Sequence, residues 1–176
     1  SKYAKGWGRP NYGIHIHVSR NFLTPQQLVK MYIFLHHRMN RGLVEHIAHR
    51  RNARWAQYDN HIPVQTKRVT THLKNIHHNK GEKANIVNLQ HPDTVEFRMF
   101  QSATKIDRIV SYFEFIQCLK SYVSTIHLSE SELTHQRTLR NSERFVDYVN
   151  TQSTQYPMLH KYVHMQQSST NCTRRR

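Results

Sequence analysis

Two histidines near the start of the sequence have the type and spacing to do chemistry. His15, His17 and Ser19 alternate with aliphatic residues in the stretch 12–19, which is the pattern of a half-buried strand. The two imidazoles should therefore lie side by side on one strand face. There they could bind a metal ion, contact phosphate oxygens or transfer protons. In a chain with 15 histidines, the same pattern also suits a solvated strand face.

A second candidate is Glu96-Phe97-Arg98, in a strand expected over 94–100. Phe97 and its apolar neighbours face the core in this interpretation, so Glu96 and Arg98 point together from the opposite face. They could form a surface ion pair that contributes less than about 1 kcal/mol. Alternatively, Glu96 is a Mg²⁺ ligand and Arg98 holds a carboxylate or phosphate.

The elements around these strands are predicted from local patterns. Thr24, Pro25 and Gln27 predict a capped helix start, and an apolar stripe then runs from Leu28 to Met39. The helix is expected to break near Gly42 and resume to a basic end at 49–51. A long basic loop is expected over 59–83. A strand over 85–90 and the turn 91–93 then lead into the Glu96 strand.

Helices are expected to make up the rest of the chain. The stripe of a helix over 105–124 includes Tyr112, Phe113 and Ile116. A capping box at 129–132 opens a helix or two, and a short last helix is expected over 158–165. Residues 1–165 should form a single domain, followed by a flexible basic tail over 166–176. The pattern as a whole predicts an α+β fold.

Composition limits the class of protein. The chain has 176 residues and a mean hydropathy of −0.78, and it contains no apolar run near the roughly 18 residues of a membrane span. Cys118 and Cys172 form no metal-site motif, which favours a reducing, cytoplasmic setting. With 26 Lys and Arg against 11 Asp and Glu, the formal net charge is +15. An anionic partner is therefore expected: nucleic acid, nucleotide phosphates or an acidic chain.

Three segments together resemble the amidoligase family of bacteria and their phages. They are Tyr-Gly-Ile-His-Ile-His-Val-Ser-Arg at 12–20, Arg-Asn-Ala-Arg at 51–54, and the segment 85–100, which contains Asn-Leu-Gln-x-Pro-x-Thr-Val-Glu-Phe-Arg. The similarity extends over most of 12–163. Its specificity lies in the His-x-His strand followed by the Glu-Phe-Arg strand.

The resemblance implies a glutamine-synthetase-like fold, with a partial antiparallel sheet lining a cleft and helices flanking it. It also implies an ATP-dependent carboxylate-amine ligase, which forms an amide through an acyl phosphate and uses ATP with Mg²⁺ or Mn²⁺. The implied catalytic residues are Glu96, Arg98 and His15, of which Glu96 and His15 would be metal ligands. Nucleotide or phosphate contacts would come from His17, Ser19, Arg54 and Lys83.

One feature of that family has no counterpart here. Its metals also need acidic residues from strands that precede the His-x-His strand, whereas residues 1–11 contain no Asp or Glu. We therefore expect one of three cases: the C-terminal half of a longer enzyme, a subunit completed by an acidic partner chain, or a relative without catalysis. The substrates would be a carboxylate and an amine, either of which could belong to a peptide.

Two other functions remain open. A His-hydrophobic-His strand also occurs in HUH endonucleases, in which the imidazoles bind a metal and a tyrosine attacks DNA. Tyr112, Tyr122 or Tyr148 could be that nucleophile. A basic module without catalysis, which binds nucleic acid or a protein, is the third possibility.

Overall fold

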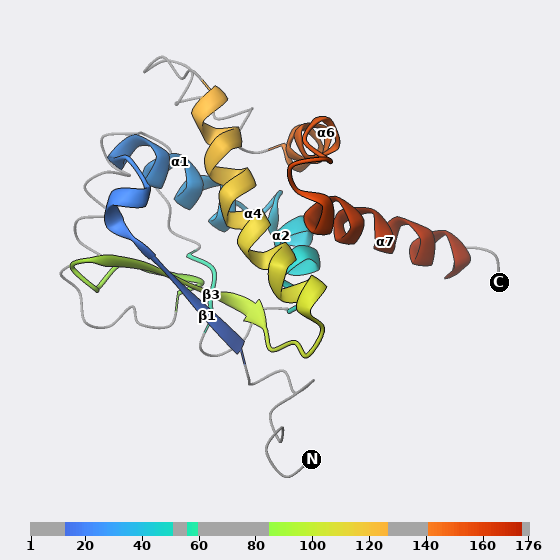
Figure 1. Ribbon diagram of the computed structural model, residues 1–176, viewed down its shortest axis with the longest axis horizontal. Helices are drawn as coiled ribbons and strands as arrows, with labels where there is room; N and C mark the ends of the chain where they lie inside the picture. Colours follow the sequence, from blue (N-terminus) through green and yellow to red (C-terminus); the bar gives the residue numbers. More distant parts are fainter. Residues whose placement is uncertain (1–12, 51–55, 60–84, 127–140, 174–176) are drawn as a thin grey trace, which may run out of the picture.

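The strand predicted around the two histidines forms as expected. In a computed structural model of the protein, which describes residues 13–50, 56–59, 85–126 and 141–173, β1 runs Gly13–Ser19 (Figure 1). A short 3-10 helix, Arg20–Phe22, leads into α1, Pro25–His36. The predicted capping box is confirmed: the Thr24 N–H donates to Gln27 Oε1 at 2.8 Å, and the Gln27 N–H donates to Thr24 Oγ1 at 3.2 Å.

The sheet has three strands in the described part of the chain. β3, Thr94–Gln101, is central, and β1 and β2, Val87–Asn88, pair with its two edges in antiparallel fashion. β2 is shorter than the strand predicted over 85–90. Its end is set by Asn88, whose side-chain oxygen accepts from the Gln90 N–H at 3.0 Å and starts a turn.

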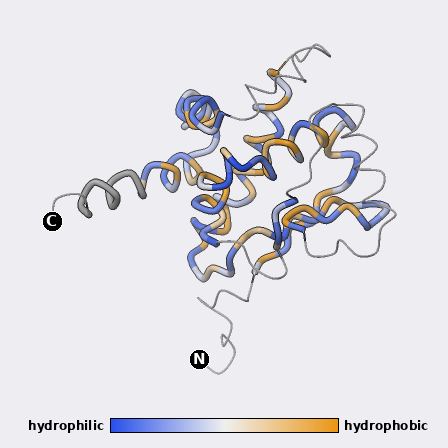
Figure 2. Tube along the Cα trace, turned by 180° about the vertical axis from the view of Figure 1, so that it is seen from behind, coloured by the Kyte–Doolittle hydropathy of each residue, from blue (hydrophilic) through white to orange (hydrophobic). Residues whose placement is uncertain are grey.

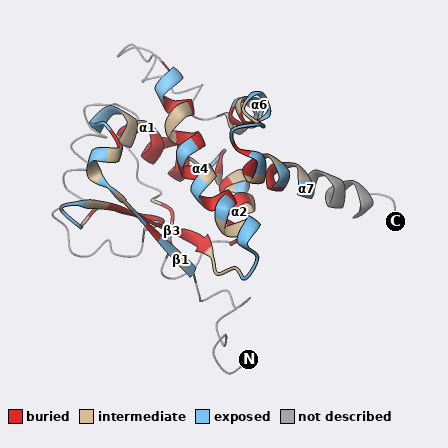
Figure 3. Ribbon diagram, viewed as in Figure 1, coloured by how far each residue is buried: buried red, intermediate tan, exposed pale blue. Residues whose placement is uncertain are grey.

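The pairing of β1 with β3 contains an irregularity. Ile14 lies opposite Phe100, but Ile16 lies opposite Phe97, so β3 has one residue more than β1 between these pairs. Such a bulge shifts the phase of the side chains. β3, which is paired on both sides, is buried along most of its length, whereas the edge strand β1 is mostly exposed or half-buried (Figure 3).

Helices complete the mixed α+β fold. Their bounds are α2, Arg41–Ala48; α4, Ile106–Thr125; α6, Ser142–Thr151; and α7, Pro157–Thr173. α4 is the central helix and contacts α1, α2, α6 and α7 (Figure 1). Apolar residues interleave with hydrophilic ones along the helices (Figure 2). Within the described residues, no helix combines the length and the apolarity needed to cross a membrane.

An aromatic core joins the sheet to the helices. Phe100 of β3 stacks on Tyr112 of α4 with ring centroids 4.5 Å apart, and it meets Phe115 edge-on. Phe145 of α6 contacts Phe34 of α1 at 5.2 Å and Phe115 at 5.8 Å. These ring contacts add to the burial of large apolar surfaces and fix α4 against the sheet.

Several predicted helix details were wrong. α1 ends at His36 because the Asn40 side chain donates to the Phe34 carbonyl at 2.9 Å, which satisfies a carbonyl at the helix end. Met39 is consequently 64% exposed, and α2 begins at Arg41 with Gly42 inside it.

Two further differences concern α4 and α7. Phe113, placed in the buried stripe of the predicted helix, is 50% exposed, because the inner face of α4 is formed by residues at 112, 115, 116, 119, 122 and 123. α7 extends to Thr173, past the predicted end at 165 and into the predicted tail. Nearly all of the expected basic loop over 59–83, and the capping box at 129–132, lie outside the described residues.

Candidate functional site

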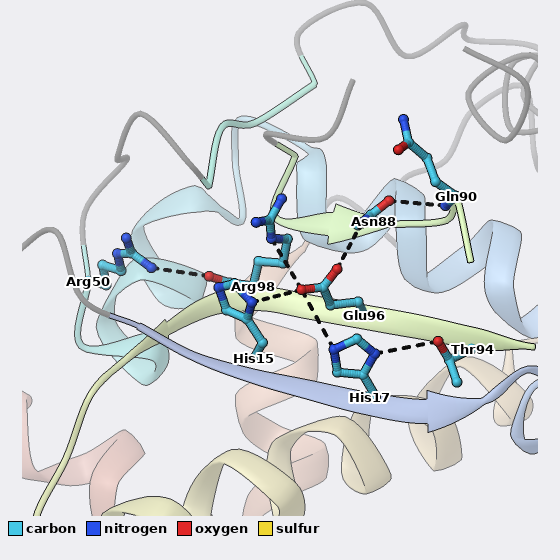
Figure 4. A network of polar contacts seen from close by, with 8 residues as sticks. All are labelled: His15, His17, Arg50, Asn88, Gln90, Thr94, Glu96 and Arg98. Atoms are coloured by element: carbon cyan, nitrogen blue, oxygen red, sulfur yellow. Dashed lines mark hydrogen bonds and ion pairs between the residues drawn. The ribbon is translucent and has the colours of Figure 1, made fainter. Parts of the chain in front are cut away.

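The two strands that the sequence singled out are neighbours, and their polar side chains meet on one face of the sheet (Figure 4). Glu96 is at the centre and only 5% exposed. Its Oε1 lies 2.8 Å from His15 Nδ1, 3.3 Å from Arg98 Nε and 3.7 Å from His17 Nε2. The structure therefore brings together four of the residues predicted to carry chemistry. We call these four residues, with Asn88 and Arg50, the Glu96 cluster.

Asn88 holds the carboxylate from the other side. Its Nδ2 donates to Glu96 Oε2 at 2.8 Å, while its own Oδ1 is fixed by the Gln90 N–H. With both oxygens engaged, Glu96 is fixed in one orientation and can hold the His15 ring through Nδ1. The His15 side chain is 39% exposed, and Nε2 is the ring nitrogen that Glu96 does not hold, so Nε2 could act on a ligand.

Arg50 reaches the same cluster from α2. His49 ends that helix in the left-handed region, with φ of 53°, and the next residue extends to the sheet, where Arg50 Nη1 donates to the Arg98 carbonyl at 3.2 Å. The guanidinium passes so close to Gly13 that a β-carbon there would clash with Arg50 Nη1 and lie 2.8 Å from the Phe100 carbonyl. Gly13 thus provides the space that Arg50 occupies.

The charges of the Glu96 cluster are unbalanced. The cluster contains two guanidiniums, those of Arg50 and Arg98, but one carboxylate. The pKa of Arg50 is lowered by burial and by the nearby Arg98 charge. The pKa of His15 is lowered as well: burial outweighs the attraction of Glu96, and Arg98, Arg50 and His17 act in the same direction as burial. His15 is therefore mainly neutral at neutral pH, and the cluster as a whole favours an anion.

The geometry does not fit a Mg²⁺ site by itself. Within the described ranges, no group of three His, Cys, Asp or Glu side chains is placed to share a metal ion. Mg²⁺ takes oxygen ligands in octahedral geometry, but Glu96 is the only carboxylate in this cluster. Both of its oxygens already accept bonds from nitrogen donors. A metal at this position would need carboxylates from outside the described residues.

His17 and Ser19 lie toward the end of β1. The His17 Nδ1 is 3.4 Å from Thr94 Oγ1, at the start of β3. Ser19 is exposed and serves as a helix cap, since its Oγ accepts from the Asn21 N–H at 3.3 Å. Of these two predicted nucleotide contacts, His17 joins the Glu96 cluster and Ser19 lies beside it.

Arg20 fixes the turn that precedes β3. Its guanidinium donates to the carbonyls of Leu89 and His91, the latter at 2.9 Å, and its backbone N–H donates to the Asp93 carbonyl at 2.8 Å. The end of β1 is thereby tied to the segment that places Asn88 and Glu96. The motif residues around the histidines thus also stabilise the site.

The remaining candidates are distributed differently. Arg54 and Lys83 lie outside the described residues. Arg50 and Asn88 were not predicted as site residues, although Asn88 is part of the Asn-Leu-Gln motif and a polar residue in a short strand is a usable signal. Arg50 gave no comparable signal, because its position depends on the backbone turn at His49 and on the space at Gly13.

The tyrosines considered as nucleophiles belong to the core. Tyr112 is fully buried and stacks on Phe100, and Tyr122 is 5% exposed against Phe145. Tyr148 is half-buried and contacts Tyr122 with ring centroids 5.5 Å apart. Burial raises the pKa of all three phenols, which disfavours the phenolate that would attack.

Comparisons of the chain with protein-family models, curated proteins and solved structures give no match. The resemblance to amidoligases therefore stays a prediction. A function for this chain has to be inferred from the residues of the Glu96 cluster and their geometry.

Proposed function

We propose that this chain is part of an ATP-dependent carboxylate-amine ligase with a glutamine-synthetase-like fold, and that the Glu96 cluster binds its phosphates. The observation that supports this most is the meeting of the two motifs of the resemblance at one carboxylate oxygen, with His15 at 2.8 Å and Arg98 at 3.3 Å. A surface ion pair would not require Glu96 to be buried between three cationic or titratable groups.

In the proposed reaction, the substrate carboxylate takes the terminal phosphoryl group of ATP and ADP leaves. The amine then displaces phosphate from the acyl phosphate, and an amide forms. Phosphoryl transfer depends chiefly on cations positioned around spreading negative charge. Arg98 and Arg50 would supply that charge, and a guanidinium can hold two phosphate oxygens at once. The neutral His15 would gain a proton when a phosphate binds beside it.

Mg²⁺ or Mn²⁺ belongs to the proposal only with additional carboxylates. Glu96 would be one ligand, and the others would come from a further acidic segment or from a partner chain. The formal net charge of +15 would favour association with such an acidic partner. The carboxylate and amine could each be a small molecule or part of a peptide.

Calorimetric titration with ATP tests the phosphate assignment. We expect Arg98→Met to weaken ATP binding by about tenfold or more, because a charge-assisted hydrogen bond is lost. Arg98→Lys should recover part of the affinity, since it restores the charge without the planar guanidinium. Lys120→Met removes the same charge at a position where the Lys120 ammonium lies over Phe22, 3.9 Å from its ring centroid, and should leave ATP binding nearly unchanged.

The ligase reaction itself can be tested with hydroxylamine as a general amine. An activated carboxylate would be trapped as a hydroxamate, with one ADP released for each hydroxamate formed. The assay combines the chain, ATP, Mg²⁺ and a panel of amino acids and peptides, with and without candidate acidic partner chains.

In the calorimetric titration, equal ATP binding by wild type, Arg98→Met and Lys120→Met would contradict the phosphate assignment.

Nucleic-acid binding is the second candidate, and the net charge is the observation that favours it. Binding through general positive charge would weaken steeply with salt. Arg98→Met and Lys120→Met should then weaken nucleic-acid binding to the same extent. Titration of a fluorescent single-stranded oligonucleotide with these two variants therefore separates a non-specific basic surface from a phosphate site at the Glu96 cluster.

A further inference from the structure

A pocket of about 380 Å³ lies at the other end of β3 from its turn. It is bounded by the end of α2, the connection from Gln101 to the start of α4, and α7. Its volume falls in the range of small-molecule sites. His49 lines this pocket, while the next residue, Arg50, reaches the Glu96 cluster. The pocket is thus a separate site that begins where α2 ends.

Two residues that line the pocket each carry a buried hydrogen-bond donor without a partner in the described chain. Tyr112 is fully buried, and its hydroxyl has no hydrogen-bond partner among the described residues. Arg108 Nη1 is also a buried atom without a hydrogen-bond partner there. Arg108 and Tyr112 are four residues apart on α4, so they lie on the same helix face. Burial raises the pKa of Tyr112 to about 12, so the phenol keeps its proton and can donate. Unsatisfied buried donors are costly and call for a ligand or ordered water.

The surrounding charges favour a negative group in this pocket. Lys105, Arg108 and Lys161 line it, and the Asp107 carboxylate is already bound by Lys161 Nζ at 2.9 Å. The positive end of α4 points there too, and the Lys105 side chain does not cap it. The neutral Tyr112 hydroxyl and the cationic Arg108 guanidinium match the two oxygens of a carboxylate. A phosphate dianion has three or more oxygens that need donors.

The apolar part of the pocket indicates the body of the ligand. Tyr162 lies beneath the Arg108 guanidinium, whose Cζ is 3.6 Å from the ring centroid, and this stacking holds Arg108 in place. Ala103 and Met165 line the same pocket, and Met165 is 58% exposed at its edge. A flat or aliphatic group could pack against these side chains while its charged end meets the donors.

We propose that this pocket binds the carboxylate of a small organic molecule through Arg108 and Tyr112, with the apolar part of that molecule packed against Tyr162 and Met165. The proposal does not rest on the ligase function, because no residue of the Glu96 cluster contributes to it.

Titration with phenylpropanoate tests the proposal, with phenylpropanamide as a neutral molecule of the same shape. We expect saturable binding of the carboxylate. The amide should bind at least about tenfold more weakly, because only the carboxylate supplies two charged acceptors. Tyr112→Phe removes only the hydroxyl and should weaken carboxylate binding about tenfold. Tyr122→Phe, which alters another buried tyrosine outside the pocket, should not.

Arg108→Lys is a second variant, since it keeps the charge but loses the planar donor and should also weaken binding. Chemical shifts of Tyr112 and Tyr162 locate the ligand directly. Equal affinity for acid and amide, or full affinity in Tyr112→Phe, would overturn the proposal. So would the absence of saturable binding across aromatic and aliphatic carboxylates, which would leave a pocket filled by water only. ATP binding should be unchanged in Tyr112→Phe, so this result is separable from that of the proposed function.

Discussion

The two faces of the sheet are built from alternate residues of the same strands but differ in what they contribute. On one face, Val95 and Phe97 of β3 and Ile16 of β1 are almost fully buried in the apolar core. On the other face, Glu96 is equally buried but among titratable and cationic groups. Burying apolar surface stabilises the fold, whereas burying charge costs free energy unless it is well paired. The first face therefore contributes to stability, and the second face is the one to which the proposed function assigns phosphate binding.

The largest effect should come from the apolar face. Phe97→Ala removes a side chain that is 1% exposed and leaves a cavity, which should lower the free energy of unfolding by about 3–5 kcal/mol. Urea denaturation measures this value. Phe113→Ala is the matched control, because the same truncation at a residue that is 50% exposed should cost far less. Similar losses at the two positions would contradict the difference in burial between Phe97 and Phe113.

If Phe97→Ala does not fold, Phe97→Leu provides the smaller step. It keeps most of the apolar volume and should cost less than about 1.5 kcal/mol. A loss as large as that expected for alanine would indicate that ring contacts, rather than volume, determine the packing of this face.

What could be predicted from the sequence was local in origin. The alternation around His15 and the capping box at Thr24 depend on residues within a few positions of each other, and both are confirmed. That Glu96 and Arg98 point from the same face of their strand was also predicted from the alternation of polar and apolar residues. What could not be predicted depends on distant parts of the chain. Arg50 joins the cluster only through the turn at His49, and the pocket beside Tyr112 requires α2, α4 and α7 to be packed together.

A smaller effect is expected on the polar face from Glu96→Gln. Glu96 accepts bonds at both oxygens, from His15 at one and Asn88 at the other, but glutamine has one acceptor and one donor. Asn88 cannot turn its oxygen toward the new amide without losing the Gln90 N–H. If the amide nitrogen faces His15 instead, that ring can accept in its other tautomer, but Arg98 Nε loses its acceptor. One buried donor is left unsatisfied in either orientation, and we expect a loss of about 2 kcal/mol in the free energy of unfolding.

Glu143→Gln, at an exposed position in the first turn of α6, is the control for the change from Glu to Gln. It should shift stability by no more than about 0.5 kcal/mol. If Glu96→Gln were as stable as the wild type in the same urea titration, the Glu96 carboxylate would not be the shared acceptor of the cluster. The contrast between the two faces would then be smaller than the geometry indicates.

The smallest effect should appear as a pH dependence that comes from His15. Its pKa in the folded protein lies below the ordinary value of 6.5, so the unfolded chain binds the proton more readily. Stability attributable to His15 is therefore fully present above pH 6.5 and is lost as the pH falls below that value. His15→Gln should lose less free energy of unfolding than the wild type between neutral and mildly acidic pH. Equal slopes for the two proteins would contradict the assignment.

Phosphate binding should change the pH dependence of stability that comes from His15. A phosphate held by Arg98 and Arg50 would favour the protonated His15 ring, because an anion stabilises the imidazolium. Inorganic phosphate should then reduce the difference in slope between the wild type and His15→Gln, compared with chloride at the same ionic strength. A general salt effect on the basic surface would act on both proteins alike. A change in slope confined to the protein with His15 would mean that phosphate binds beside this ring and stabilises its protonated form. The polar face, unlike the apolar one, would then gain stability from a bound anion.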